Sequence, residues 1–382
     1  MAQFNGNRLK KARIYRGYTV AELAEKVQCQ RQTLSMYEIS KSQPADEQTV
    51  ERLSYELNFP KDYFFEEDSC EDKGTVYFRS LLTTNKRYRS EQIIKMEFLC
   101  YVYKMLQDYI EFPQFVAPAF EENITPEEAA IELRKKWNLG IKPIDNIIPI
   151  VEQHGIIVTS FNTSTDDVDA FSKYVEIGEN PTYIIAYSKN KESASRKHFD
   201  IAHELGHICL HEWSEDIEEI SKEDFKKKEK EANEFASAFL LPKESFSKDV
   251  LAGDKSLPYY KQLKKKWKVS IGAMLYRSLS LNLITREEYQ DLIRTMQRRG
   301  QVKTEPLDDV LITAEPSLFR RAIILLLNEN VFTKKEFMET LSEEYGLSIN
   351  PSEIETLLDL PDGTLTTPNI VDISIQLKQN NR

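Results

Sequence analysis

Five consecutive residues, from His203 to His207, constrain what this chain can fold into more than any other stretch. They read His-Glu-Leu-Gly-His, and on a helix this spacing places two imidazole rings one turn apart on the same face. Both rings can then reach one tetrahedral zinc ion at about 2.0–2.1 Å. Glu204 would stand beside a water molecule at the metal, where a carboxylate can take up a proton and return it. The motif therefore predicts a zinc-dependent hydrolytic site on a helix.

A hydrolytic zinc ion needs a third protein ligand and keeps its fourth position for water. Downstream, Glu229, Asn233 and Ala236 share one face of a predicted helix, because they lie four and three residues apart. We expect Glu229 to complete the metal site and Asn233 to hold a ligand ring by a hydrogen bond. Glu231 and Glu234 are rival ligands, although their directions leave this face.

The two stretches together resemble the ImmA/IrrE family of zinc metallopeptidases over roughly residues 120–280. The resemblance implies that His203, His207 and Glu229 bind the metal and that Glu204 is the general base. The family's commoner Leu-Met-Pro ending is Leu-Leu-Pro here, which touches no catalytic position. The residues that carry the resemblance are Ala202, His203, Glu204, Gly206, His207, Glu229, Asn233, Ala236 and the run Leu240-Leu241-Pro242.

Three further residues near these motifs have candidate roles. His211 is a third histidine at helical spacing, but it follows His203 by eight residues. Eight residues span about 12 Å of helix axis, so one straight helix cannot bring both rings to one ion. We expect His211 at the surface or behind a metal ligand. Tyr276 and Arg277 are candidate donors to a transition state.

Length and charge limit the number of domains and the kinds of partner that this chain can have. A chain of 382 residues exceeds one ordinary compact domain and predicts two to four. The net charge of −11 disfavours a protein that coats nucleic acid, yet residues 1–60 hold nine Lys and Arg against seven Asp and Glu. A local DNA contact by this mildly basic head is therefore allowed. No apolar run approaches the roughly 18 residues of a membrane span, and no signal peptide is evident, so we expect a cytoplasmic protein without a membrane partner.

The first 60 residues read as four short helices around one small core. The expected helices are Asn7 to Arg16, Val20 to Val27, Arg31 to Ile39 and Glu47 to Leu57. The tight turn between the second and third is that of a helix-turn-helix, whose second helix enters the major groove of DNA. A helical protein-docking module is the alternative.

This head resembles the XRE-type helix-turn-helix of phage repressors. The resemblance rests on Arg8-Leu9-Lys10, Leu23-Ala24, the run Leu34-Ser35 with Tyr37-Glu38, and Pro44. It implies DNA binding through the third helix, by a homodimer on an inverted repeat. Gln and Arg side chains can form paired hydrogen bonds with adenine and guanine edges. The residues expected to face DNA are Gln30, Arg31, Gln32 and Ser35.

Between the head and the metal motif, three β-branched or aromatic runs predict strands. They cover residues 156–159, 174–177 and 182–187. We expect a small antiparallel sheet, with residues 182–187 as the edge strand that pairs with substrate backbone. An acidic, polar stretch over residues 66–74 is the expected linker between head and body.

The sequence thus predicts an α+β protein with five parts. Expected are a helix-turn-helix over 1–66, a linker and long helix over 67–115, a gluzincin-like zinc peptidase over 116–250, a helical helix-turn-helix-like subdomain over 251–300, and a helical C-terminal domain over 301–382.

Three functions remain open. By resemblance, the chain is a DNA-targeted zinc endopeptidase that cleaves a helix-turn-helix repressor and so switches a stress, mobile-element or defence locus. The alternative is an XRE-type regulator or antitoxin whose metal site is sensory or vestigial. A scaffold without either activity is disfavoured, because the ligand set and the base are both complete.

Overall fold

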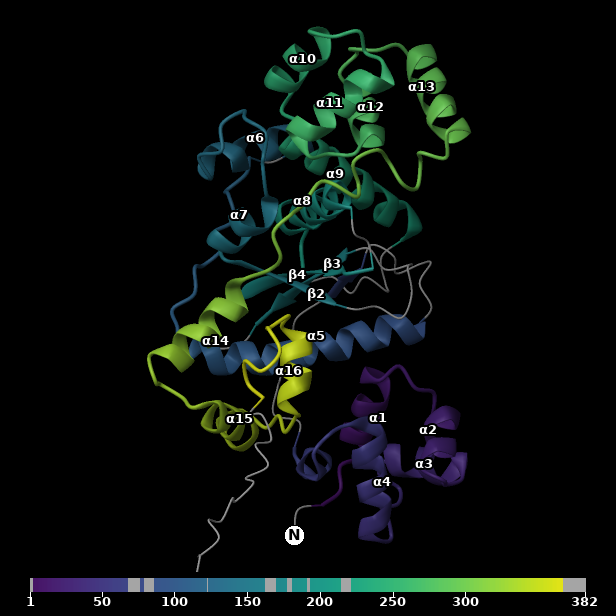
Figure 1. Cartoon of the computed structure of the whole chain (residues 1–382), viewed down its shortest axis with the longest axis vertical. Coiled ribbons are helices and arrows are strands. Elements are labelled where there is room, and N and C mark those ends of the chain that lie inside the picture. Colours follow the sequence, from purple (N-terminus) through teal and green to yellow (C-terminus); the bar gives the residue numbers. More distant parts are fainter. Residues whose placement is uncertain are drawn as a thin grey trace, which may run out of the picture.

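The computed structural model describes residues 3–67, 76–78, 86–121, 123–161, 170–176, 181–190, 193–213 and 221–366. In the described part, a small sheet lies at the middle of the molecule (Figure 1). Helices α8 (Ala194–Leu210) and α9 (Lys222–Leu240) lie on one side of it and the long helix α5 (Lys86–Gln107) on the other. The α+β class predicted from the sequence is confirmed.

The head consists of α1 (Gly6–Tyr15), α2 (Val20–Lys26), α3 (Arg31–Glu38) and α4 (Glu47–Leu57), followed by a 3-10 turn, η1 (Lys61–Phe65). Each helix agrees with its predicted range to within one residue at either end. Side-chain caps explain this agreement. Asn5 accepts hydrogen bonds from the first amides of α1, and Thr19 with Glu22 forms a capping box on α2.

The sheet contains β1 (Val76–Phe78), β2 (Ile156–Phe161), β3 (Ala170–Val175) and β4 (Thr182–Ser188), in the spatial order β1-β3-β4-β2. The β1–β3 and β3–β4 pairs are antiparallel, whereas β2 and β4 are parallel. The predicted all-antiparallel sheet is therefore wrong for one pair, because β2 pairs with β4 and not with the strand that follows it.

The predicted edge strand is also wrong, since β4 lies between β3 and β2. The reason is visible in its sequence. Residues 182–188 read Thr-Tyr-Ile-Ile-Ala-Tyr-Ser, and all but Tyr183 are buried. A strand that is apolar on both faces belongs inside a sheet that is covered on both sides.

Beyond the head, the described chain contains further helices. They are α5 (Lys86–Gln107), α6 (Pro126–Lys136), α7 (Ile147–Gln153), α8 (Ala194–Leu210), α9 (Lys222–Leu240), α10 (Lys243–Leu251), α11 (Leu257–Trp267), α12 (Ile271–Ser280), α13 (Arg286–Arg298), α14 (Leu318–Asn328), α15 (Lys334–Glu343) and α16 (Pro351–Leu357). No helix in the described ranges combines the length and the apolarity needed to cross a membrane.

Two hydrophobic clusters occupy the two faces of the sheet. Ile156 and Val158 of β2 belong to the cluster with α6 to α9, whereas Ile157 and Phe161 belong to the cluster with α5. This alternation follows from the two-residue period of a strand. The α5 cluster also contains the head and α14 to α16, so the two ends of the described chain share one core.

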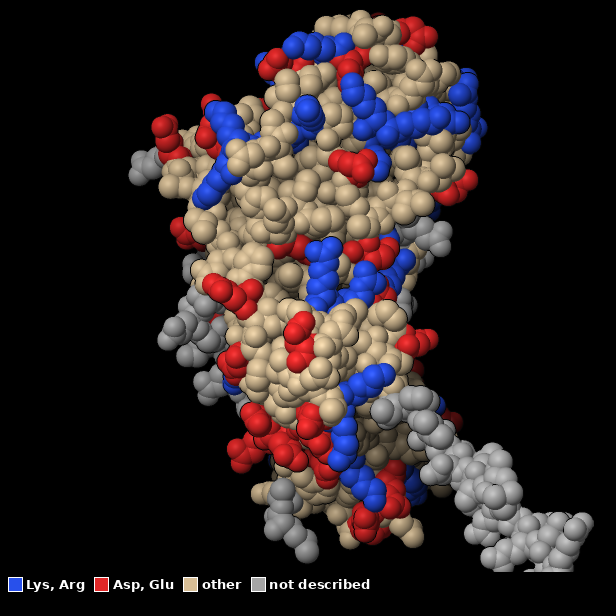
Figure 2. Space-filling view, turned by 60° about the vertical axis from the view of Figure 1, so that its left-hand side comes forward, with Lys and Arg blue, Asp and Glu red and all other residues tan. Residues whose placement is uncertain are grey.

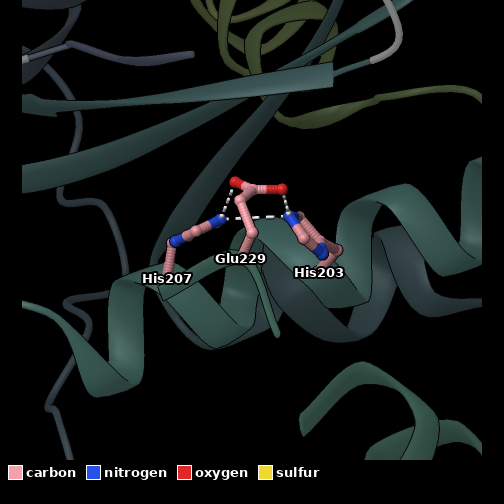
Figure 3. Close-up of side chains that lie close together, drawn as sticks. All are labelled: His203, His207 and Glu229. Carbon is pink, nitrogen blue, oxygen red and sulfur yellow. Dashed lines mark hydrogen bonds and ion pairs between the residues drawn. The ribbon is translucent and has the colours of Figure 1, made fainter. Parts of the chain in front are cut away.

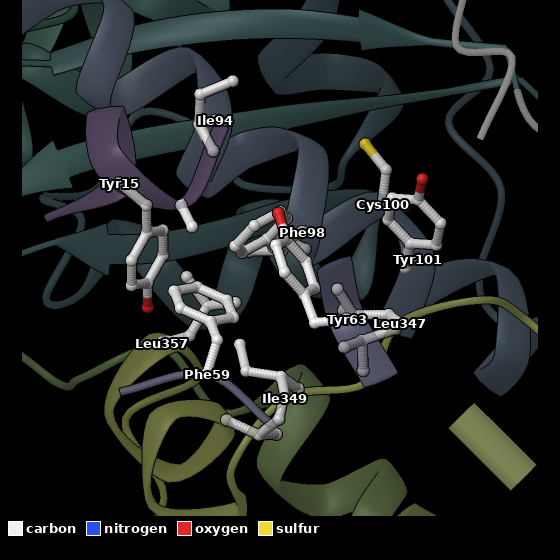
Figure 4. Packing of buried hydrophobic residues seen from close by; sticks show 14 of the residues in the cluster. Tyr15, Phe59, Tyr63, Ile94, Phe98, Cys100, Tyr101, Leu347, Ile349 and Leu357 are labelled. Atoms are coloured by element: carbon white, nitrogen blue, oxygen red, sulfur yellow. The ribbon is translucent and has the colours of Figure 1, made fainter. Parts of the chain in front are cut away.

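The head is docked onto α5 and the C-terminal helices. Tyr15 stacks on Phe98 of α5 with ring centroids 5.0 Å apart, close to Leu357 of α16 (Figure 4). Arg16 forms an ion pair with Glu353 at 2.8 Å. The fully buried Arg8 donates hydrogen bonds to the carbonyl oxygens of Glu67, at 2.7 Å, and Gly346, at 2.8 Å.

Residues 68–74 of the predicted linker lie outside the described residues. Glu66 at its start is held in place, because its carboxylate accepts a hydrogen bond from the Ser348 amide at 2.9 Å and lies 3.5 Å from Arg8. Burial raises the pKa of the Glu66 carboxyl. The predicted domain boundaries at residues 66, 115, 250 and 300 stay predictions.

Candidate metal centre

The site lies between α8 and α9, which approach each other closely. Small residues allow this approach. A Cβ atom on Gly206 would lie 3.1 Å from the backbone of Ala232, closer than side chains normally pack. Gly206 thus lets the histidine-bearing face of α8 lie against α9, where Glu229 is found.

His203, His207 and Glu229 come together at one point (Figure 3). The two histidine Nε2 atoms lie 3.0 Å apart, and the Glu229 oxygens lie 3.6 Å from His203 Nε2 and 3.2 Å from His207 Nε2. Among the described residues, this is the one cluster of at least three His, Cys, Asp or Glu side chains that could hold a metal ion.

These distances fit a zinc ion. Tetrahedral bonds of about 2.0–2.1 Å hold neighbouring ligand atoms about 3.3 Å apart, which matches the observed spacing. Both histidine rings are fully buried, and the Glu229 side chain is 17% exposed. Without a metal ion, burial acts to raise the pKa of the Glu229 carboxyl, but the protonated forms of His203 and His207 beside it outweigh this effect and lower the pKa to about 2.

Asn233 fixes the orientation of the first histidine. Its amide nitrogen donates to the Glu229 carbonyl at 2.7 Å, so its oxygen faces His203 Nδ1 at 3.2 Å. His203 Nδ1 must then carry the proton, which leaves the lone pair of Nε2 directed at the centre of the cluster. The structure thus brings Asn233 next to His203, and its role in holding a metal ligand stays a prediction.

His211 and Glu231 lie behind the second histidine. His211 Nδ1 is 2.9 Å from His207 Nδ1, and His211 Nε2 is 3.2 Å from the Glu231 carboxylate. Burial and the neighbouring His207 lower the pKa of His211 to about 4. Glu231 therefore faces His211 and not the cluster, while the other rival, Glu234, lies on the surface 3.5 Å from Lys230.

Glu204 lies beside the cluster, with one oxygen held by Ser172 of β3. Ser172 Oγ donates to Glu204 Oε2 at 2.5 Å, and both side chains are fully buried. The strand predicted from the sequence begins at residue 174 and therefore leaves out Ser172. The alternation of Phe171, Lys173 and Val175 on one face with Ser172 on the other is the signal that would have extended the strand.

The two candidate transition-state donors differ in position. Arg277 is buried and forms two 2.6 Å hydrogen bonds with the Glu127 carboxylate, so its predicted role in the site is wrong. Its guanidinium joins α12 to α6. Tyr276 is 54% exposed and lines a cavity of about 440 Å³ together with Glu229 and Asn233.

The predicted DNA-facing residues lie at the start and on the outer side of α3. Gln30, Arg31 and Gln32 are exposed, and Ser35 is half-buried. None of them takes part in the docking of the head onto α5 described above.

A second concentration of positive charge lies at the opposite end of the molecule. Figure 2 shows Lys and Arg side chains gathered over its upper end, where Figure 1 places α11 to α13. Lys264 of α11 is an exception among the lysines of this helix. It is buried and pairs with Glu305 and Asp308 at 2.8 and 2.7 Å. The exposed basic residues of α11 and α13 are Lys261, Lys265, Lys266, Arg286, Arg294 and Arg298.

Comparison with known proteins gives one informative match. Residues 151–279 match the model of the IrrE N-terminal-like domain, which defines peptidase family M78. No curated protein matches the chain. Among solved structures, the Bacillus thuringiensis protein PlcR in complex with the peptide PapR7 and DNA is 14% identical and aligns over 78% of this chain and 98% of its own, with a TM-score of 0.15. At that score the similarity carries no inference. Residues 151–279, which contain the entire candidate metal centre, are thus similar to the IrrE N-terminal-like domain of a peptidase family.

Proposed function

We propose that this chain is a cytoplasmic, zinc-dependent endopeptidase that its N-terminal helices direct to DNA. The observation that carries the proposal is the convergence of His203, His207 and Glu229 on one point, with Glu204 next to His203 in the chain and its carboxylate hydrogen-bonded to Ser172. Two imidazoles and a carboxylate are the ligand set of hydrolytic zinc sites that keep a fourth position open. The match of residues 151–279 to a peptidase family model supports the same reaction class.

Each residue of the site would have a defined task. A bound zinc ion would supply Lewis acidity, which polarises a peptide carbonyl and lowers the pKa of water. Glu204 would take the proton of the attacking water and pass it to the leaving amine. Ser172 would hold Glu204 in one orientation, since it donates to the oxygen on one side of that carboxylate. The buried setting strengthens these electrostatic interactions.

The proposed substrate is a helix-turn-helix repressor that controls a stress, mobile-element or defence locus. This part rests on the family resemblance and on the head, whose residues Gln30, Arg31 and Gln32 are exposed on α3. A head that binds DNA, as a homodimer on an inverted repeat, would bring the peptidase close to a repressor bound at the same operator.

A second candidate function is supported by a different observation. His203, Glu204 and His207 are all fully buried in this conformation. A buried metal centre is what a metal sensor without peptidase activity would have. Metal binding would then change the affinity of the head for DNA. In that case the chain is a transcription regulator or antitoxin.

The variant Glu204→Gln separates the two functions. It keeps the size of the side chain, and Glu204 is no ligand, so zinc content, fold and DNA binding should be unchanged. Peptide-bond cleavage should fall by about 10²–10⁴-fold, because an amide cannot accept the proton of water. Glu234→Gln, an exposed glutamate on α9, is the matched control.

Two quantities are measured in cells. One is the length of the neighbouring repressor protein, and the other is the level of transcription from that repressor's promoter. The peptidase proposal requires that the parent chain and Glu234→Gln shorten the repressor and that Glu204→Gln does not. Equal regulation by all three chains, with no protein cut under inducing conditions, would establish the regulator instead.

A further inference from the structure

The edge of β3 beside the metal centre is covered by a segment from far upstream in the chain. In the sheet order β1-β3-β4-β2, the short strand β1 pairs antiparallel with β3. The register places Tyr77 opposite Ser172, with Val76 opposite Lys173 and Phe78 opposite Phe171. Ser172 is the residue that donates to Glu204. The centre of β1 is therefore paired with the strand position nearest the proposed general base.

This edge is where an extended substrate would lie. A general base must come within hydrogen-bond reach, directly or through one water, of the group it serves. A peptide added to β3 would run about 4.7–4.9 Å from it and would be held by main-chain hydrogen bonds. Such a peptide would pass Ser172, and hence Glu204, at the position that Tyr77 holds.

We propose that β1 occupies the substrate-binding edge of this enzyme and inhibits it from within the same chain. This proposal rests on the proposed peptidase function and states how that activity is regulated. The substrate is an extended stretch of polypeptide, and it binds only when residues 76–78 leave β3. A tethered segment competes at an effective concentration in the millimolar range, so it excludes weakly binding peptides. The fully buried His203, Glu204 and His207 agree with a closed site.

The head holds the chain on both sides of β1. Upstream, Arg8 of α1 donates to the carbonyl oxygen of Glu67 at 2.7 Å. Downstream, Arg87 at the start of α5 donates to the Gly17 carbonyl and lies 3.1 Å from Glu22. Glu67 and Arg87, which flank β1 in the chain, thus both contact the N-terminal helices that we propose to bind DNA.

A disulfide between positions 76 and 173 tests the proposal without removing β1. Cα atoms of paired antiparallel residues lie about 4.5–5.5 Å apart, within the range that disulfides span. The chain Val76→Cys/Lys173→Cys is made with Cys70→Ser, so that the native thiol nearest in sequence cannot compete. The single-cysteine chains, treated alike, are the controls. The second variant replaces residues 76–78 by three prolines, which removes the amides needed for pairing.

The first readout is binding, which needs no catalysis. A fluorescent peptide of residues 73–81 is titrated into each chain, all carrying Glu204→Gln and checked for helicity and zinc content. The triple-proline chain should bind this peptide at least about ten times more tightly than the oxidised double-cysteine chain, and reduction should restore the affinity of the parent. Equal affinity in the oxidised and reduced double-cysteine chain overturns the proposal, even if the triple-proline chain does not fold.

The second readout uses the same chains with Glu204 present. Repressor cleavage should stop on oxidation and return on reduction. If the affinity for the peptide depends on whether β1 is locked, but no chain cleaves the repressor, the peptidase proposal is refuted. In that case β1 is still the segment that occupies a peptide-binding edge. Cleavage that continues unchanged while β1 is locked would refute the inhibition and leave the peptidase standing.

Discussion

His211 Nδ1 lies 2.9 Å from His207 Nδ1, and this contact determines which nitrogen of His207 is free for a metal. His211 Nε2 faces the Glu231 carboxylate at 3.2 Å, so Nε2 carries the proton and Nδ1 accepts. His207 Nδ1 is then the donor, and the lone pair of His207 Nε2 is directed at Glu229 and His203. Asn233 sets the same tautomer in His203. The two histidines are prepared for one ion by different partners.

Removal of these partners should weaken zinc binding without abolishing it. His211→Ala and Glu231→Ala should each raise the zinc dissociation constant about 10–100-fold, the usual cost of losing a group behind a ligand. Glu229→Ala should lose the metal altogether, because it removes a ligand. Elemental analysis and competition with a chelator measure both, with Glu234→Ala as the control. A chain that keeps zinc after Glu229→Ala and loses it after Glu231→Ala would show that the third ligand is wrongly assigned.

Ser172→Ala should slow the reaction while leaving the metal in place. The lost hydrogen bond is to a charged carboxylate, and such bonds contribute about 1.5–3 kcal/mol, or roughly a ten- to hundredfold effect. Because Ser172 orients the base and is not itself a ligand, kcat should fall while KM and zinc content stay constant. Ser172→Thr keeps the hydroxyl and should recover most of the rate. Steady-state kinetics of repressor cleavage measure kcat and KM. If zinc is lost together with the activity, Ser172 has a structural role and does not orient the base.

Arg31→Ala should weaken DNA binding by about 1–3 kcal/mol if Arg31 contacts a base edge. The residue is exposed at the start of α3, so the substitution should not change folding. Lys10→Ala, an exposed basic residue on α1, is the charge-matched control. Fluorescence anisotropy of the full chain on DNA from its own promoter region, at low salt, measures the effect. Equal losses from both substitutions would mean that Arg31 supplies only charge, and no binding by the parent chain would remove the DNA-binding proposal.

The stability of the fold should fall in mild acid because of His198. Burial, with a smaller contribution from the positive charge of Lys268, lowers the pKa of this histidine to about 4, against about 6.5 for an exposed ring. Between these values the unfolded chain binds a proton that the folded chain does not. The contribution of neutral His198 to the free energy of unfolding is therefore complete above pH 6.5 and is lost as the pH falls toward 4. It amounts to on the order of 3 kcal/mol in all. Its ring lies 2.9 Å from Thr313 Oγ1, next to Asp145 and Lys268.

Urea unfolding at pH 7.5 and pH 5 measures this effect. His198→Asn is expected to be less stable than the parent at pH 7.5 and to lose less stability between the two pH values, because asparagine does not titrate. Identical pH dependence in both chains would show that other groups, such as the buried carboxyls, dominate the acid response.

The helices of the site were predictable because their signals are local. The i and i+4 spacing of His203 and His207 fixes their common face wherever the helix lies, and Asn233 follows Glu229 by one turn for the same reason. The caps at Thr19, Thr125 and Thr333 likewise act within three residues, and all three form in the structure. Such features need no knowledge of the rest of the fold.

The features that were missed depend on pairings between distant segments. Whether β2 pairs with β3 or β4 is decided by packing on both sheet faces, and no residue of β2 encodes it alone. Ser172 reaches Glu204 only because β3 packs against α8. His211 ends α8, and its contact with Glu231 joins positions on two helices. The pairing of Arg16 with Glu353 spans nearly the whole chain, and sequence spacing carries no sign of it.

The shared core of the two ends has a consequence for how the protein is made. The head leaves the ribosome first and can form its own four helices at once. The faces of Tyr15 and Phe59 that end in the core with Leu347, Ile349 and Leu357 must wait until those residues are synthesised. At about 5–20 residues per second this delay lasts on the order of tens of seconds. During that interval the nascent head presents an uncovered aromatic surface, and a chain that stops before residue 345 presents it for its whole lifetime.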